Sequence, residues 1–292
     1  MKTTLKITKW IFCGFMIMLL AGATIMKLKP YQAGESDDKF YFPVKQFSSL
    51  EKIKHEEIFL KNQSGQQLHT VLFAPAADVN AKDVAIFLLH GAGGNISRYS
   101  SFAETLTNAG FWVYTLDWQG FGKSEGKPTH LNVYQDTGLA FQHFLNLPQV
   151  KGKKVMVYGL SLGGQLAIKL TKDYQNKVDG LVTEGSAASF YSLAADNSPA
   201  FMRPLLWLIV KGPYNAQEDI REINATPTLI IQSTDDKNVA FARGQELFEN
   251  AVGPKEFWPI KGEHLAGLKL NQAFYLQKLE NLVQVKVMVT NK

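Results

Sequence analysis

Short apolar runs alternate with helical stretches along most of the chain. The runs are rich in β-branched and aromatic residues and have the length of strands that a parallel sheet buries on both faces. They cover Val84 to Leu89, Phe111 to Leu116, Val155 to Tyr158, Gly180 to Thr183, Thr228 to Gln232 and Glu256 to Pro259. Helices are expected at Ser97 to Ala109, Leu131 to Leu147, Leu162 to Tyr174, Ala240 to Ala251 and from about Lys269 to Leu282.

Two further strands precede this pattern. Glu56 to Lys61 and Leu68 to Pro75 flank the turn-forming residues Asn62 to Gly65 and predict a hairpin. This order predicts an α/β fold with a mostly parallel, twisted sheet of eight strands and helices on both faces. The loops at the strand carboxyl ends are expected to carry the functional site. Val283 to Thr290 alternates apolar and polar residues as a strand does.

The remaining segments divide the chain around this domain, which is expected over residues 56–292. Residues 1–29 are expected to be a membrane anchor or signal segment, and residues 30–55 a tether, because their charges and aromatic residues follow no period. An insert at about 186–222 is expected to form a short cap over the site.

The membrane prediction depends on Trp10 to Met26, seventeen residues without a charge, which lie at the lower edge of what spans a bilayer. Ala21 to Ala23 resembles a cleavage site, but no polar region precedes it, so an uncleaved anchor is favoured over a secreted product. Lys2, Lys6 and Lys9 precede the run, which places the domain outside the cytoplasm, on the periplasmic or extracellular face. The single cysteine, Cys13, lies inside the run, so the domain can form no internal disulfide.

The length of the chain suits one large α/β domain.

The distribution of charge excludes a nucleic-acid partner. The formal charge of +5 comes from five lysines that precede the first acidic residue, Glu35, and without them 26 basic residues face 26 acidic ones. A neutral domain offers no basic stripe to a phosphate backbone.

A nucleophilic serine is the strongest chemical signal. Gly159-Leu160-Ser161-Leu162-Gly163 stands where a strand ends and a helix begins. The glycines allow a sharp, strained turn that exposes the hydroxyl group of Ser161. This G-x-S-x-G pattern, in this context, predicts a serine hydrolase.

A glycine-rich loop follows an earlier strand in His90-Gly91-Ala92-Gly93-Gly94. Gly91 allows substrate to approach the backbone, and the N–H groups of Ala92 and Leu162 are the expected donors to the oxyanion of the tetrahedral intermediate. A phosphate-binding loop is excluded, since Gly122-Lys123-Ser124 has Asp117 where that motif needs its first glycine.

The serine needs a base and an orienting acid, which this fold supplies in the order Ser, acid, His after later strands. His264, in a glycine-flanked loop after the last expected strand, is the histidine that follows both Ser161 and a suitable acid. Asp235 and Asp236 follow the strand Thr228 to Gln232, and Asp236 is preferred because of its spacing from the next helix. The other histidines show no ligand spacing, so neither a metal nor another cofactor is expected.

These residues resemble the α/β-hydrolase superfamily over nearly all of the chain from about Glu56 to Leu282. His90 to Asn95 and Gly120 to Pro128 look most like the lysophospholipase, monoglyceride lipase and protein-depalmitoylating branches. The resemblance implies a serine esterase that hydrolyses carboxylic esters or thioesters, often of lipids, through an acyl-enzyme intermediate.

The expected cap contains an apolar run, Leu205 to Val210. It is either a buried helical turn or an acyl-binding wall, and Leu206 and Trp207 are the candidate substrate contacts. A lipid or long-acyl ester is therefore the favoured substrate. A serine peptidase or amidase with the same triad stays an alternative, as does a catalytically silent, membrane-tethered binding module.

Overall fold

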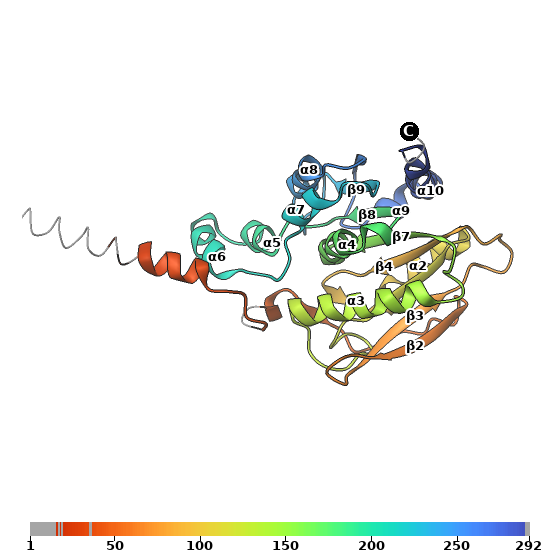
Figure 1. Ribbon diagram of the computed structural model, residues 1–292, viewed down its shortest axis with the longest axis horizontal. Coiled ribbons are helices and arrows are strands. Elements are labelled where there is room, and N and C mark those ends of the chain that lie inside the picture. The colour runs from red at the N-terminus through yellow and green to blue at the C-terminus, as the bar shows by residue number, and fades with distance from the viewer. Residues whose placement is uncertain (1–15, 17, 19, 35–36, 290–292) are drawn as a thin grey trace, which may run out of the picture.

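A sheet of eight strands forms the centre of the molecule in the computed structural model, which describes residues 16, 18, 20–34 and 37–289 (Figure 1). The strand order is β10-β9-β8-β7-β4-β6-β3-β2. Only the pairs β2 with β3 and β3 with β6 are antiparallel. The strands are β2 (His55–Lys61), β3 (Gln67–Phe73), β4 (Val84–Leu89), β6 (Trp112–Leu116), β7 (Lys154–Leu160), β8 (Gly180–Glu184), β9 (Thr228–Ser233) and β10 (Lys255–Ile260). The predicted mostly parallel α/β sheet is confirmed.

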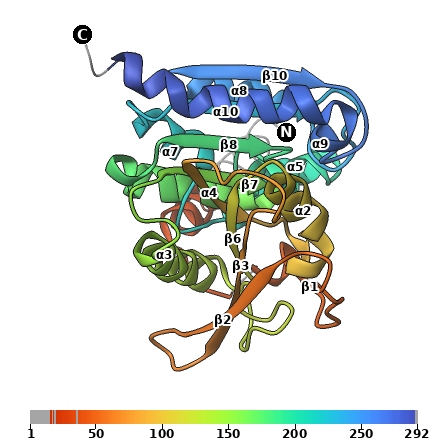
Figure 2. The ribbon, with the colours of Figure 1, turned by 90° about the vertical axis from the view of Figure 1, so that its right-hand side faces the viewer.

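Helices cover both faces of this sheet, as predicted (Figure 2). They are α2 (Ser100–Asn108), α3 (His130–Asn146), α4 (Leu162–Asp173), α8 (Phe241–Asn250), α9 (Gly267–Leu270) and α10 (Gln272–Val289). Helix α3 begins with a capping box in which the Thr129 side chain accepts from the Asn132 amide, and it ends just before Pro148, where a helix cannot continue easily.

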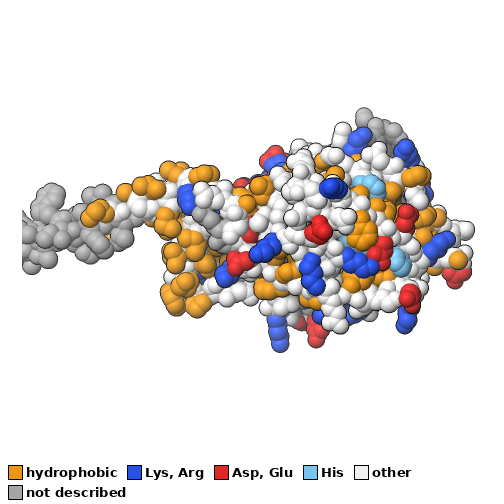
Figure 3. Space-filling view, turned by 90° about the horizontal axis from the view of Figure 1, so that it is seen from below, with side chains coloured by type: hydrophobic (Ala, Val, Ile, Leu, Met, Phe, Trp, Pro, Cys, Tyr) orange, Lys and Arg blue, Asp and Glu red, His pale blue; other side chains and the backbone are white. Residues whose placement is uncertain are grey.

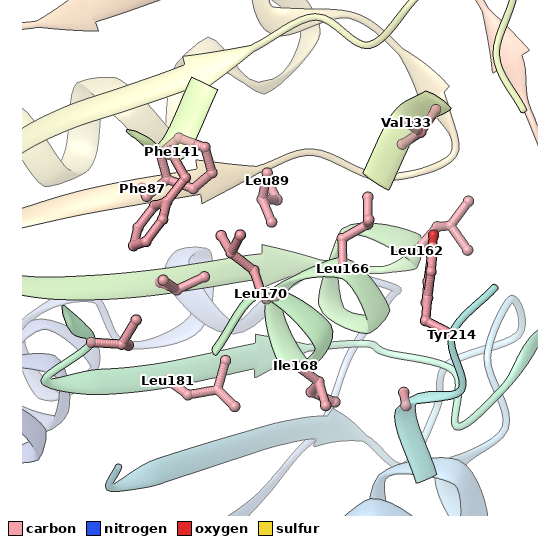
Figure 4. Close-up of a cluster of buried hydrophobic side chains, with 14 of the residues drawn as sticks. Phe87, Leu89, Val133, Phe141, Leu162, Leu166, Ile168, Leu170, Leu181 and Tyr214 are labelled. Carbon is pink, nitrogen blue, oxygen red and sulfur yellow. The ribbon is translucent and has the colours of Figure 1, made fainter. Parts of the chain in front are cut away.

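Strand β4 shows why two cores form. All six of its residues are buried, and they alternate between two hydrophobic clusters on opposite faces of the sheet. Phe87 and Leu89 pack in the cluster that α3 and α4 cover (Figure 4), whereas Ile86 and Leu88 pack in the cluster that α2 and α10 cover. A continuous apolar run thus reads correctly as a strand buried on both faces.

Residues 37–53 pack on the domain, although the sequence predicts a tether over 30–55. Phe40 and Tyr41 are buried in the larger core cluster, and the short strand β1 (Phe42–Pro43) pairs in parallel with β5 (Gly93–Gly94). Asp37 is also buried, where one carboxylate oxygen accepts from the His130 amide at 2.8 Å. The absence of a sequence period misled the prediction, because single aromatic side chains anchor this segment.

The predicted cap contains α5 (Phe190–Asp196), α6 (Arg203–Ile209) and α7 (Ala216–Asp219). The helix over residues 20–28 lies beside α6 at one end of the molecule (Figure 1), and Lys27 Nζ stands 4.0 Å from the centre of the Trp207 ring. Of the helices in the described part of the chain, none has the length and apolarity to cross a bilayer. Residues 1–15, 17 and 19, which make up most of the predicted anchor, lie outside the described residues.

The strand expected over residues 283–290 is helical as far as Val289. Leu279, Leu282 and Val283 are buried, and their spacing of three and four residues is that of one helix face. Burial of this face against the sheet outweighs the alternation of apolar and polar residues that follows.

Candidate active site

Ser161 stands between the end of β7 and the start of α4 with φ 54° and ψ −121°. A Cβ atom at Gly163 would lie 2.3 Å from the carbonyl oxygen of His90, and one at Gly159 would lie 2.4 Å from the carbonyl oxygen of Gly163. Both glycines of the G-x-S-x-G motif are therefore required by close backbone packing. The turn holds Ser161 in a strained conformation of the kind found at functional sites.

The loop that carries Gly91 passes directly beside this serine. A Cβ atom at Gly91 would lie 3.1 Å from Ser161 Cβ and 2.7 Å from the Tyr99 hydroxyl oxygen. The Tyr99 hydroxyl group donates to the Gly93 carbonyl at 3.1 Å. The loop is thus held in contact with Ser161, and the helix N-terminus at Leu162 adds a positive dipole end beside it.

The buried His90 side chain holds the same loop in place. Burial lowers the pKa of His90, so its ring is neutral at pH 7, and Nδ1 donates to the Gly91 carbonyl at 2.7 Å. Asp117 Oδ1 accepts from the Ile96 amide at 2.7 Å, which fixes the chain where it leaves the loop. His90 and Asp117 thus hold the two ends of the glycine-rich loop in place.

His264 and Asp236 form a close hydrogen-bonded pair. His264 Nδ1 donates to Asp236 Oδ2 at 2.6 Å, and the other carboxylate oxygen accepts from the Asn238 and Val239 amides at 2.8 and 3.0 Å. Burial raises the pKa of Asp236, but the hydrogen bonds from His264 and the amides outweigh it and hold the pKa below its usual range. The carboxylate is therefore ionised at neutral pH and fixes the orientation of the imidazole.

Asp235 has a different partner. Its side chain is exposed, and Oδ2 accepts from the Gly262 amide at 2.9 Å, which lowers the pKa of Asp235. The structure therefore brings Asp236, and not its neighbour, to the imidazole of His264.

Gly185 links the histidine to the serine. The Ser161 amide donates to the Glu184 carbonyl at 2.8 Å. Gly185 directly follows this hydrogen-bond partner of Ser161 in the chain. A Cβ atom at Gly185, where φ is +62°, would lie 2.8 Å from His264 Cε1 and 3.0 Å from His264 Nδ1. The imidazole thus rests on the backbone that holds the serine.

Residues 80–212 of this chain match the family described as "Serine aminopeptidase, S33". The chain is 26% identical over 244 residues to alpha/beta hydrolase domain-containing protein 17B of Homo sapiens, covering 82% of this chain and 78% of that protein. It is 23% identical to protein bem46 of Schizosaccharomyces pombe over 188 residues, which are 64% of this chain and 62% of bem46. The esterase Pf2001 of Pyrococcus furiosus has a similar structure, with a TM-score of 0.67 at 18% identity, covering 84% of this chain and 97% of the esterase.

The chain has the α/β-hydrolase fold and is similar in sequence to alpha/beta hydrolase domain proteins. The predicted fold, the resemblance to this superfamily and the general prediction of a hydrolase are confirmed. The roles of single residues and the choice of substrate stay predictions.

The two predicted substrate contacts in the cap of this hydrolase lie in different surroundings. Leu206 is half-buried and packs against the larger core cluster. Trp207 is 48% exposed and contacts Lys27, which also donates to the Trp207 carbonyl at 3.1 Å. Helix α6 lies beyond α5, next to the N-terminal segment (Figure 1).

Sequence reasoning missed Tyr99 and Gly185. A tyrosine in an amphipathic helical stretch carries no distinctive signal, and the Tyr99 contact to the loop depends on how the short helical turn Ile96–Tyr99 is placed. Gly185 did have a signal, since it directly follows the strand next to β7, where a side chain would point toward the site.

Proposed function

We propose that this hydrolase cleaves carboxylic esters with Ser161 as nucleophile, His264 as base and Asp236 as orienting acid. The observation that supports this most is the 2.6 Å hydrogen bond from His264 Nδ1 to Asp236, formed where the imidazole packs on Gly185, the residue after the backbone partner of Ser161. Because Nδ1 is held by that bond, Nε2 is the ring nitrogen that can accept the serine proton.

The proposed reaction has two halves. Ser161 Oγ attacks the carbonyl carbon and its proton passes to His264 Nε2, while the negative charge on the former carbonyl oxygen is stabilised by the Ala92 and Leu162 N–H groups. The alcohol leaves with the proton from Nε2, and the acyl group stays on Oγ. Water, deprotonated by the same nitrogen, then attacks the acyl-enzyme and releases the acid.

A lipid or long-acyl ester, or thioester, is the proposed substrate, met at a membrane surface outside the cytoplasm. The support is an exposed apolar surface at the end of the molecule where the cap meets residues 20–28 (Figure 3). Phe201 is 79% exposed and Trp207 48% exposed, which is unusual for side chains of this size unless they contact another apolar phase. The uncharged run from Trp10 to Met26, which extends into this segment, supports attachment to the same membrane.

A serine aminopeptidase is the second candidate, because the matched family carries that description. Such an enzyme needs a carboxylate to bind the substrate ammonium group. His264 borders a surface hollow of about 520 Å³ that also contains Asp235 and Glu263, although Lys237 lies there too. An ester carbonyl is more electrophilic than an amide carbonyl, and an alkoxide is a better leaving group than an amide anion, so this triad is expected to cleave esters in either case.

Hydrolysis of p-nitrophenyl acetate, octanoate and palmitate, compared with alanine p-nitroanilide, tests the proposal. We expect the octanoate or palmitate to give the highest kcat/KM, with turnover abolished in Ser161→Ala. Faster cleavage of the anilide than of every ester would favour the aminopeptidase. Turnover that persists in Ser161→Ala would contradict both candidates, and a preference for acetate would contradict the lipid substrate.

A further inference from the structure

Glu184 is a buried acidic residue at the end of β8 that the proposed reaction does not use. Its side chain is 1% exposed, and both carboxylate oxygens accept hydrogen bonds. Oε1 accepts from the Gly267 amide at 2.8 Å, and Oε2 accepts from the hydroxyl groups of Tyr158 at 2.8 Å and Tyr275 at 2.6 Å. A buried carboxylate with three donors fixes the position of each donor.

These donors belong to three segments that the site must hold together. Tyr158 lies on β7, the strand that leads to Ser161. Gly267 lies three residues after His264 and begins α9, and Tyr275 lies on α10. The Glu184 carboxylate therefore joins the strand of the serine to the loop of the histidine.

The backbone of the same residue contacts the serine. The Glu184 carbonyl accepts from the Ser161 amide at 2.8 Å, and the His264 ring rests on Gly185. One residue thus bonds Ser161 through its main chain and the histidine loop through its side chain. The distance between nucleophile and base depends on both contacts.

The loop from Gly262 to Gly267 needs such an anchor. Leu265 has φ 61°, a backbone conformation that is energetically unfavourable for any residue other than glycine. It persists only where neighbouring contacts enforce it. Asp235 binds the amide at one end of the loop at 2.9 Å, and Glu184 binds the amide at the other end at 2.8 Å. His264 lies between these two anchors.

We propose that Glu184 is a positioning residue that sets where His264 stands relative to Ser161. This inference rests on the proposed function of the two residues. Burial raises the pKa of Glu184, while the tyrosine and amide hydrogen bonds and the nearby His264 act in the opposite direction. The geometry assigns the role to the reach of the side chain and not to its charge.

Two substitutions separate reach from charge. Glu184→Asp keeps the carboxylate but withdraws it by one carbon–carbon bond, ~1.5 Å, which breaks the contact with Gly267. Glu184→Gln keeps the reach, and its amide oxygen can still accept from Gly267, but it removes the charge. Tyr275→Phe is the matched control, because it removes one bond to Oε2 and leaves the Gly267 contact in place.

We expect Glu184→Asp to lower kcat by up to ~10²-fold, the effect of misplacing a catalytic group by about 1 Å, with KM unchanged. Glu184→Gln and Tyr275→Phe are expected to stay within about threefold of wild type in kcat. The opposite order, with Gln inactive and Asp active, would assign the role to the charge and overturn the proposal. Equal kcat in all folded variants, with only the melting temperature lowered, would leave Glu184 a purely structural role and overturn it as well.

Hydrogen exchange of the Gly267 amide, followed by NMR, gives a readout that does not need turnover. We expect faster exchange in Glu184→Asp and near-native exchange in Glu184→Gln. Equal exchange in both variants would contradict the anchor. If the proposed function failed, the wild type would show no Ser161-dependent hydrolysis, whereas the exchange rates would still test the anchor.

Discussion

Replacement of Gly185 by alanine perturbs the contact between His264 and the backbone that holds Ser161. The added methyl group would lie 2.8 Å from His264 Cε1 and 3.0 Å from Nδ1. Carbon atoms in van der Waals contact stand about 3.5–4.0 Å apart, so the imidazole must move by roughly 1 Å. Because Nδ1 also donates to Asp236, the movement strains that hydrogen bond and changes the position of the imidazole relative to Ser161.

The expected effect has two separable parts. Because φ at this position is +62°, alanine loses about 1–2 kcal/mol of stability from backbone strain alone. A displacement of about 1 Å at a catalytic group lowers the rate by ~10²-fold, equivalent to about 2.7 kcal/mol of transition-state stabilisation. The second part is expected only if His264 is the base.

Gly152→Ala is the matched control. Gly152 has φ +82°, and no atom lies within 4 Å of the position of its Cβ. Alanine there introduces the same kind of backbone strain without touching the site. Urea unfolding measures stability, and hydrolysis of p-nitrophenyl octanoate measures kcat and KM for both variants and the wild type.

We expect both variants to lose similar stability, and only Gly185→Ala to lose activity, mainly in kcat. Native kcat in folded Gly185→Ala would refute the placement of His264 as the base. An equal loss of activity in Gly152→Ala would show that backbone strain, and not the contact with the imidazole, is responsible.

Three further predictions concern other parts of the molecule. Asp236→Asn presents an amide N–H group to His264 and favours the wrong tautomer, so kcat is expected to fall by about 10⁴-fold in the ester assay, and a loss below tenfold would contradict the orienting role. Burial lowers the pKa of His130 from 6.5 to about 4. Between pH 6.5 and pH 4, His130 therefore binds a proton in the unfolded chain but not in the folded one. His130 should therefore account for a loss of about 2 kcal/mol of unfolding free energy between pH 7 and pH 5, and in urea unfolding the loss over this range should be smaller by that amount in His130→Gln than in wild type. Phe201→Ser removes an apolar contact with lipid of about 1.5–3 kcal/mol, so binding to anionic vesicles in a sedimentation assay should weaken about tenfold, and unchanged binding would exclude this surface.

Much of the fold follows from local pattern. Val84 to Leu89 in β4 and Val155 to Tyr158 in β7 are apolar without interruption because helices cover both faces of the sheet along these strands. The elbow at Ser161 is also local, since two glycines and the strand-to-helix change lie within a few residues. The position of His264 follows from strand order, which places its loop at the same sheet edge.

Other features depend on contacts between distant segments. Asp235 and Asp236 are adjacent, and what selects Asp236 is that the Asn238 and Val239 amides fix its second oxygen. The packing of Phe40 and Tyr41 follows no period, because each ring fills a separate space against the domain. The bonds that join Glu184 to Gly267 and Tyr275 span more than eighty residues. A single sequence gives no local sign of such pairs.

Labelling with a fluorophosphonate probe, followed by mass spectrometry of the modified peptide, tests the central claim most directly. Because the probe phosphonylates a serine only where a base activates it, the account predicts one adduct, on Ser161, that is absent in Ser161→Ala and much slower to form in His264→Ala. An adduct on another residue, or labelling of Ser161 at the wild-type rate in His264→Ala, would contradict it.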